Sequence, residues 1–261
     1  MRLKPKKRLG QNFLVDKNIQ RKLITAYGLQ AGESVLEIGA GYGELTRLIA
    51  RQVDSVYALE IDQDLCRLLR DNTEREKNIK IINRDILKFN LRRHFARSKN
   101  KIKVVGNIPY YITTPIIEHL LSYRDKVETV LITLQKEFAR RITAPPGSRD
   151  YGSFSCFVQY YSIPKILFLI KKTCFSPPPK VDSCLAELKL REKPAVAVKN
   201  ERLFFRIIRA AFNQRRKTLR NSLDGIIPQA KLTSFFKAYG LDRNIRPEDL
   251  ALVDFARLAK L

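Results

Sequence analysis

Short apolar segments that alternate with helical patterns constrain the fold of this chain more than any other feature. Ser34–Ile38, Ser55–Leu59, Ile79–Ile82 and Ile102–Val105 each have the length and apolar content of a buried strand. Helical patterns follow the first two of these segments and the fourth. This alternation predicts an α/β fold built on an open sheet.

A glycine-rich turn follows the first predicted strand. The residues are Gly39-Ala40-Gly41-Tyr42-Gly43, and a helical pattern begins at Glu44. Glycines let the backbone approach a ligand closely and leave N–H groups free at the start of a helix. The GxGxG spacing differs from the GxGxxG of dinucleotide-binding proteins, and the acidic Glu37 before it disfavours a pyrophosphate. Ordinary strand-to-helix geometry is the alternative explanation for this turn.

Acidic residues end the next two predicted strands. Glu60 follows the second strand, where an acid can accept hydrogen bonds from both hydroxyls of a ribose. Asp85 follows the third strand and is placed either to accept from the amine of an adenine or to cap a turn. Both positions therefore predict contacts to a nucleoside.

The motif Gly-Asn-Ile-Pro-Tyr at 106–110 follows the fourth predicted strand. Asn107 offers both an amide oxygen acceptor and an NH2 donor, and Pro109 stiffens the backbone. Tyr110, backed by Tyr111, offers a flat ring on which a base can stack. Together these residues can hold a planar heterocycle with an exocyclic amine. The alternative is an Asx turn followed by a core aromatic residue.

The composition indicates a polyanionic partner. The 261 residues include 50 Lys and Arg against 26 Asp and Glu, a net charge of +24. Nucleic acid is the first candidate and an anionic membrane surface the second. No apolar run approaches the roughly 18 residues of a spanning helix, and the basic N-terminus lacks the apolar stretch of a secretory signal. The cysteines are scattered without a CxxC pair, which disfavours a zinc site or a disulfide framework and predicts a reducing cytoplasm.

A change in composition over Arg191–Lys199 predicts a domain boundary. We expect one domain over residues 1–192, with a basic flexible tail at 1–11, and a helical, basic, nucleic-acid-binding domain over 193–261. Phe154–Tyr161 is expected to form a helix that faces the sheet. The basic stretch Arg209–Leu223 suits phosphate contacts, although a charge run is often a solvated surface.

The order and spacing of these motifs resemble those of class I S-adenosylmethionine-dependent methyltransferases. Further segments make the chain similar to the ribosomal RNA adenine dimethyltransferase family over nearly its whole length: Gly10–Leu14, Leu134–Glu137, Phe175–Ser183 and Arg209–Leu223. The resemblance implies a Rossmann-like methyltransferase sheet with a small, all-helical C-terminal domain. It also implies S-adenosylmethionine as the cofactor, with S-adenosylhomocysteine as its product, and no metal.

The resemblance assigns roles to residues of this sequence. The implied cofactor contacts are Asn12, Leu14, Gly39, Gly41, Glu60, Ile61, Asp85, Ile86 and Asn107. The implied catalytic group is Asn107, Ile108, Pro109, Tyr110 and Phe175, with Phe175 either across the target base from Tyr110 or serving as a loop anchor. The implied RNA contacts are Lys6, Lys7, Arg8, Arg215, Arg216, Lys217 and Arg220.

The function implied by the resemblance is dimethylation of the 6-amino groups of two adjacent adenosines in the 3′-terminal hairpin loop of small-subunit (16S) rRNA. Such an enzyme would act on the immature small ribosomal subunit during its maturation, as a cytoplasmic monomer with no membrane partner. The alternatives are a dimethylase of large-subunit RNA, a DNA adenine methyltransferase and a non-enzymatic RNA-binding assembly factor. A nicotinamide-dependent dehydrogenase is disfavoured by the glycine spacing.

Overall fold

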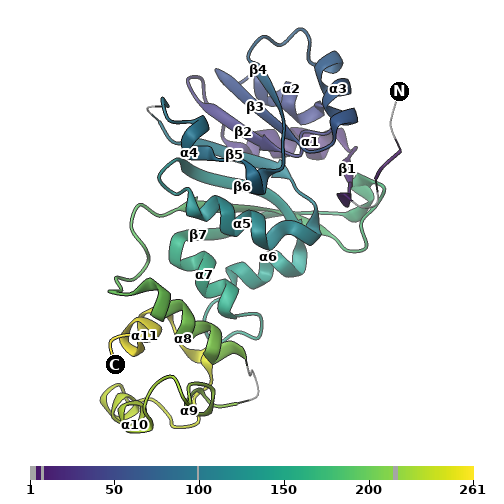
Figure 1. Cartoon of the computed structure of the whole chain (residues 1–261). Coiled ribbons are helices and arrows are strands. Elements are labelled where there is room, and N and C mark those ends of the chain that lie inside the picture. The colour runs from purple at the N-terminus through teal and green to yellow at the C-terminus, as the bar shows by residue number, and fades with distance from the viewer. Residues whose placement is uncertain (1–3, 7–8, 99, 214–216) are drawn as a thin grey trace. The chain divides into compact units, whose positions relative to one another are not determined.

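A mixed seven-stranded sheet organises the N-terminal part of this computed structural model, in the order β4-β3-β2-β5-β6-β9-β7 (Figure 1). The structure describes residues 4–6, 9–98, 100–213 and 217–261. The strands of the sheet are β2 Ser34–Ile38, β3 Ser55–Glu60, β4 Ile79–Asn83, β5 Ile102–Asn107, β6 Val127–Gln135, β7 Ser162–Ile170 and β9 Ser183–Leu190.

The order of the strands creates a switch point between β2 and β5. The chain runs outward from β2 through β3 to β4 and then returns to the other side of β2 with β5, and all these pairs are parallel. β6 continues the parallel arrangement, and β9 pairs with it antiparallel. In open α/β sheets, ligands bind outside the carboxyl ends of the strands at such a switch point. The glycine turn after β2 and Asn107 at the end of β5 both lie there.

Helices cover both faces of the sheet, with α1 and α2 behind it and α5 in front (Figure 1). A buried apolar cluster joins α1 and α2 to the sheet through residues such as Leu23, Ile49, Val56 and Val105. The helices and short helical turns of this region are α1 Lys17–Tyr27, α2 Glu44–Ala50, α3 Gln63–Asn72, η2 Ile86–Lys88, α4 Leu91–His94, η3 Tyr110–Ile112, α5 Thr113–Ser122, α6 Lys136–Thr143 and η4 Lys172–Cys174.

The ends of α1 follow from its sequence. Asp16 accepts hydrogen bonds from the backbone N–H groups of Asn18 and Ile19, which no carbonyl within the helix can satisfy. Gly28 ends the helix in the left-handed conformation. At α5, Thr113 is the first residue of the helix and Pro115 is the third.

A second, two-stranded sheet ties the N-terminal segment to a distant loop. β1 Phe13–Leu14 pairs antiparallel with β8 Phe175–Ser176, with Leu14 opposite Phe175. Both side chains of this pair are buried in the same apolar cluster as α1 and α2. The pairing therefore fixes the segment that enters the switch point.

The chain divides into two compact units, of which the first contains the residues up to Ala139 and Ile163–Glu192. The second contains Arg140–Ser162 and Lys193–Leu261. Its helices are α7 Ser153–Tyr161, α8 Glu201–Asn213, α9 Leu219–Ser222, α10 Gln229–Ala238 and α11 Leu252–Leu258, with the turn η5 Pro247–Asp249.

Residues 140–162 differ from our prediction, which placed them in the N-terminal domain with a helix facing the sheet. Tyr160 and Tyr161 on α7 both donate hydrogen bonds to the carboxylate of Glu201 on α8. Gly147 donates its backbone N–H to the carbonyl of Glu248. These contacts between residues far apart in the sequence join 140–162 to the C-terminal helices, and composition along the chain gives no sign of them.

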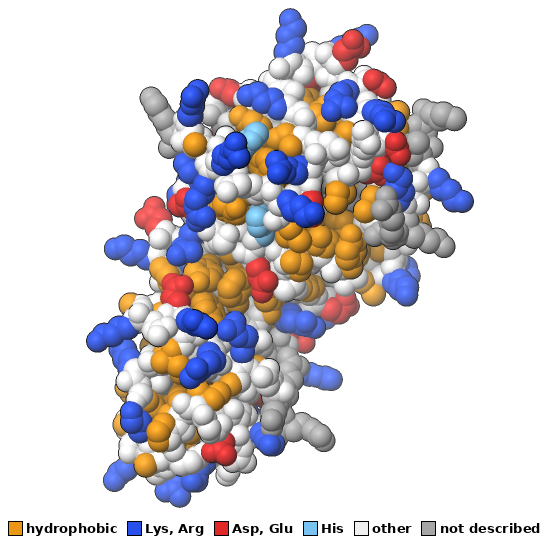
Figure 2. Space-filling view, in the orientation of Figure 1, with side chains coloured by type: hydrophobic (Ala, Val, Ile, Leu, Met, Phe, Trp, Pro, Cys, Tyr) orange, Lys and Arg blue, Asp and Glu red, His pale blue; other side chains and the backbone are white. Residues whose placement is uncertain are grey.

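Lys and Arg side chains are spread over the visible surface of each unit, and acidic side chains are fewer (Figure 2). Within the described residues, no helix combines the length and the apolar character needed to cross a bilayer.

Candidate active site

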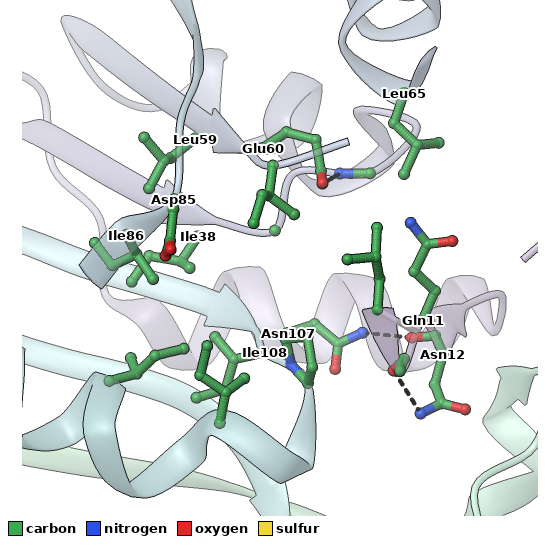
Figure 3. Close-up of a pocket in the computed structure, with 18 of the residues that line it drawn as sticks. Gln11, Asn12, Ile38, Leu59, Glu60, Leu65, Asp85, Ile86, Asn107 and Ile108 are labelled. Atoms are coloured by element: carbon green, nitrogen blue, oxygen red, sulfur yellow. Dashed lines mark hydrogen bonds between the residues drawn. The ribbon is translucent and has the colours of Figure 1, made fainter. Parts of the chain in front are cut away.

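A pocket opens at the carboxyl ends of β2, β3 and β5, with about 820 Å³ of empty space that includes its opening to solvent. It brings together most of the residues predicted to bind the cofactor: Asn12, Gly39, Gly41, Glu60, Ile61, Asp85, Ile86 and Asn107 (Figure 3). The predicted catalytic residues Asn107, Ile108, Pro109 and Tyr110 line it as well. Leu14 does not line this pocket, and instead borders an adjoining hollow that also contains Glu37 and Gln20.

Close packing of β2 against β5 leaves no room for side chains at two glycines. A Cβ on Gly106 would lie 2.6 Å from the carbonyl oxygen of Ile38. Gly39 has a φ of +75°, and a Cβ there would lie 3.2 Å from the backbone oxygen of Asn107. The glycine turn therefore lies directly against the Asn107 strand, as the switch point requires.

Glu60 is a buried carboxylate at the end of β3, with only 5% of its surface exposed. Gly41 donates its backbone N–H to Oε2 at 3.0 Å, and Asp62 donates its own to Oε1 at 2.9 Å. Burial raises the pKa of Glu60, while these N–H groups oppose the shift. A buried acid whose oxygens face the pocket retains lone pairs for further donors, which the hydroxyls of a ribose can supply.

Apolar and polar groups meet at the far end of the pocket. Ile86 is buried and Ile61 is exposed, and both line the cavity. Asp85 accepts the backbone N–H of Leu87 through Oδ1 at 2.9 Å, so it caps η2 and also lines the pocket. The site thus combines apolar surfaces for a planar ring with a carboxylate at its edge.

Asn107 is the last residue of β5, and its amide is held in one orientation. Its Nδ2 donates to the backbone carbonyl of Asn12 at 2.8 Å (Figure 3). A carbonyl oxygen can only accept, so the amide nitrogen must face Asn12 and the amide oxygen must face away from it. The oxygen Oδ1 is therefore the atom that can accept from the amine of a substrate.

Tyr110 is half-buried, and its hydroxyl shares a hydrogen bond with the hydroxyl of Ser183 at the start of β9. This bond fixes the ring beside Pro109 at the edge of the pocket. Tyr111 is 67% exposed, so it lies at the mouth rather than in the interior.

Phe175, which we placed in the catalytic group, does not line the pocket that contains Tyr110. Its side chain is 3% exposed and packs in the apolar cluster with Leu14 and Leu23. The physical reason is the β1–β8 pairing, which places Phe175 opposite Leu14 and directs both into the core. The structure supports the alternative that Phe175 anchors its loop.

A buried acid lies below the glycine turn. Glu37 is 2% exposed, and burial raises its pKa to about 8, with the nearby charge of Glu60 adding to the shift. Its Oε2 makes no hydrogen bond to any residue that the structure describes. Glu37 is therefore a neutral acid over much of the pH range in which the isolated side chain would be charged.

Sequence reasoning missed three residues that organise the pocket. Gln11 lines the pocket itself, while Asp62 bonds to Glu60 and Gln11, and Ser183 bonds to Tyr110. Asp62 could have been found as the N-cap of α3. The bonds from Gln11 to Asp62 and from Ser183 to Tyr110 each join residues at least 51 positions apart, and no local pattern indicates them.

The structure describes only some of the residues that we predicted to contact RNA. Lys7, Arg8, Arg215 and Arg216 lie outside the described residues. Lys217 and Arg220 are exposed, and Arg220 donates to Gln229 at 2.7 Å. Lys6 differs from our prediction, because its ammonium is bound to the carboxylates of Asp62 and Asp64 at 2.7 and 2.8 Å.

Comparison with known proteins agrees with this geometry. The family model described as ribosomal RNA adenine dimethylase matches residues 2–261. The chain is 42% identical to the Ribosomal RNA small subunit methyltransferase A of Streptococcus pneumoniae over 262 residues, which cover 97% of this chain and 90% of that protein.

Two solved structures are similar over almost the whole chain. A dimethyladenosine transferase from Plasmodium falciparum superposes with a TM-score of 0.81 at 24% identity, covering 94% of this chain and 95% of that one, which shows the shared fold. The 23S rRNA methyltransferase ErmE superposes with a TM-score of 0.75 at 25% identity, covering 96% of this chain and all of that one.

Proposed function

This chain belongs to the ribosomal RNA adenine dimethylase family, and from that premise we propose that it dimethylates two adjacent adenosines of small-subunit rRNA. The enzyme is a ribosomal RNA adenine dimethyltransferase that uses S-adenosylmethionine. Each of the two adenosines, in the 3′-terminal hairpin loop, would receive two methyl groups on its 6-amino nitrogen. The 42% identity to a small-subunit enzyme, against 25% to a 23S rRNA enzyme, favours the small subunit as the substrate.

The observation that carries this proposal is the orientation of the Asn107 amide. Its Nδ2 is bonded to the carbonyl of Asn12, so Oδ1 is the atom of this amide that is placed to accept from a substrate. An adenine 6-amino group is a poor nucleophile, since its lone pair is delocalised into the ring. Acceptance of its hydrogens by Oδ1 and by the nearby carbonyl of Ile108 would aim the nitrogen and oppose this delocalisation.

The residues of the pocket fit the proposed cofactor. The buried Glu60 would accept from the ribose hydroxyls, while Ile61, Ile86 and Asp85 would hold the adenine of the cofactor. S-adenosylmethionine supplies a methyl group that is electrophilic because it is bonded to a sulfonium. The protein contributes positioning and electrostatics, with no general base among the proposed groups and no role for a metal.

The target base must leave its stack to reach a pocket of this kind. The ring of Tyr110, fixed by Ser183, would then provide a stacking surface for it. Lys217 and Arg220 of the second unit would contact the surrounding phosphates. We further propose that the protein acts as a cytoplasmic monomer, consistent with its scattered cysteines.

Methylation of purified RNA particles tests the proposal directly. Immature small subunits, naked small-subunit RNA and large subunits would be incubated with enzyme and labelled cofactor, and the modified nucleotides mapped. We expect dimethyladenosine at two adjacent positions near the 3′ end of the small-subunit RNA. Modification only of large subunits, or of an isolated adenosine, would contradict the proposal.

A further inference from the structure

Asp62 is a buried carboxylate that the proposed reaction does not use directly. Only 4% of the residue is exposed, and it lies two residues after Glu60, which lines the pocket. A buried charge is stable only when hydrogen bonds and opposite charges compensate for the loss of water. The partners of Asp62 therefore indicate what this acid holds in place.

Two side chains that bond to Asp62 belong to the N-terminal segment, defined here as residues 4–6 and 9–14, and its Oδ1 also accepts the backbone N–H of Asp64. Lys6 Nζ donates to Oδ1 at 2.7 Å, and Gln11 Nε2 donates to Oδ2 at 3.1 Å. Lys6 also donates its backbone N–H to Gln11 Oε1 at 2.8 Å, which joins the two partners to each other. Burial would raise the pKa of Asp62, but these bonds outweigh burial and lower it, which marks the carboxylate as ionised.

The other end of the N-terminal segment reaches the catalytic amide. The carbonyl of Asn12 accepts the Nδ2 of Asn107 at 2.8 Å, and the side chain of Asn12 donates back to the carbonyl of Gly10 at 3.2 Å. Gly10 lies against the ring of Tyr111, since a Cβ on Gly10 would be 3.1 Å from that ring. The segment thus runs from the acid at the end of β3 to the Asn-Ile-Pro-Tyr motif at the end of β5.

We propose that Asp62 is a positioning residue for methyl transfer: it latches the N-terminal segment through Lys6 and Gln11, and the latched segment orients the Asn107 amide. The inference rests on the proposed function, because it assigns the acceptor role to Asn107 Oδ1. If the hydrogen bond to the carbonyl of Asn12 is lost, the Asn107 amide can rotate so that Nδ2 and Oδ1 exchange places. A flipped amide would present NH2 to the amine of adenine, where two donors face each other and no bond forms.

Lys6 accordingly has a role different from a phosphate contact. Its ammonium is bound by the carboxylates of Asp62 and Asp64. The side chain of Asp64 is 48% exposed, so this second carboxylate binds Lys6 from the protein surface. A phosphate would have to compete with both carboxylates, whereas a latch requires them.

The test compares three variants that open the latch with one matched control. Asp62→Asn keeps the shape and the capping oxygen but loses the charge, while Lys6→Met and Gln11→Ala remove its partners. Asp125→Asn is the control, because it removes an ion pair of similar length, Arg92 to Asp125 at 2.8 Å, far along the chain from the segment. Backbone hydrogen exchange of the N-terminal segment is measured without RNA or cofactor, beside single-turnover methylation at saturating RNA and cofactor.

We expect each latch variant to speed exchange at residues 9–14 and to slow single-turnover methylation about tenfold or more, while the affinity for the RNA particle changes less than twofold. Lys6→Met combined with Asp62→Asn should be no slower than either alone, because both break the same latch. Asp125→Asn should match the wild type in both measurements.

Three results would overturn the latch. One is faster exchange with unchanged methylation, and another is slower methylation with unchanged exchange. The third is a loss of RNA affinity confined to Lys6→Met, which would make Lys6 a phosphate contact. If Asp62→Asn fails to fold, Gln11→Ala decides, since Gln11 is only partly buried. Failure of the proposed function is distinguishable, because the wild type would then not methylate the particle while the exchange data would still report the latch.

Discussion

Glu60 ends β3 and Asn107 ends β5, and backbone groups fix the orientation of both side chains. Two N–H groups fix the carboxylate of Glu60, and one carbonyl fixes the amide of Asn107. Because the backbone is held by the strands, both side chains are oriented before any ligand arrives, which is the basis of electrostatic preorganisation. Substitution at each position should therefore affect one step and spare the other.

Glu60→Ala should weaken S-adenosylmethionine binding by roughly 1–3 kcal/mol, the usual range for hydrogen bonds to a charged group. The affinity of Glu60→Gln for the cofactor should lie between those of Glu60→Ala and the wild type, because glutamine keeps one acceptor oxygen. Calorimetric titration of the folded variants with cofactor measures the change. An unaltered affinity in Glu60→Ala would reject the ribose contact.

Asn107→Ala should reduce single-turnover methylation by two or more orders of magnitude, on the order of 3 kcal/mol, while leaving binding of the RNA particle nearly intact. Asn107→Asp keeps an acceptor but cannot donate to Asn12, so it should be more active than Ala and less active than wild type. Melting temperatures are recorded alongside. Equal losses of stability and activity in both variants would mean that Asn107 only shapes the chain.

Glu37 predicts a pH dependence of stability in the protein without cofactor. Its pKa is about 8 in the folded state against an ordinary value of 4.5. The folded protein therefore holds a proton that the unfolded chain releases, and stability should fall as pH rises through this range, by up to about 1.4 kcal/mol per pH unit. Glu37→Gln should remove this contribution, so its melting temperature relative to wild type should rise from pH 5 to pH 8. The exposed Glu74→Gln serves as the control, and parallel curves for wild type and Glu37→Gln would contradict the shift.

At the scale of elements, strand and helix patterns predicted most of the sheet. The predicted runs Ser34–Ile38, Ser55–Leu59 and Ile102–Val105 form β2, β3 and β5, because each has the apolar content of a strand buried on both faces. The second and third of these strands extend slightly further, to Glu60 and Asn107. The pairing of β1 with β8 could not be predicted, because each strand has only two residues and the paired residues Leu14 and Phe175 are 161 positions apart. The burial of Phe175 in the core follows from this pairing.

Phe175 should act as a core residue rather than a stacking surface. Phe175→Ala should destabilise the fold by about 3–5 kcal/mol, as for other buried aromatic residues. Phe175→Leu keeps most of the buried volume and should retain both stability and methylation. Denaturant unfolding and single-turnover assays of the two variants measure this. A stable Phe175→Leu variant that had lost most of its activity would restore a role for the aromatic ring.

For the whole molecule, composition predicted the kind of partner but not the division of the chain. A net charge of +24 indicates a polyanion at once, because so large an excess is unfavourable without one. The assignment of residues 140–162 to the second unit depends on bonds such as Tyr160 to Glu201, which join segments 41 residues apart. Net charge is a sum over residues and can be calculated from the sequence, whereas such hydrogen bonds depend on how the chain folds.

The excess charge makes RNA binding sensitive to salt in a way that distinguishes specific phosphate contacts from general attraction. Each phosphate that a basic residue neutralises adds about 0.7–0.9 to the slope of log affinity against log salt. Lys217→Gln combined with Arg220→Gln should weaken particle binding and reduce this slope by up to about 2, while cofactor affinity is unchanged. Arg75→Gln with Lys77→Gln is the matched control, because these exposed residues of the first unit change the net charge equally. Filter binding from low to moderate salt measures the slopes. Equal changes in the two double variants would mean that net charge alone attracts the RNA, and that Lys217 and Arg220 belong to a solvated surface.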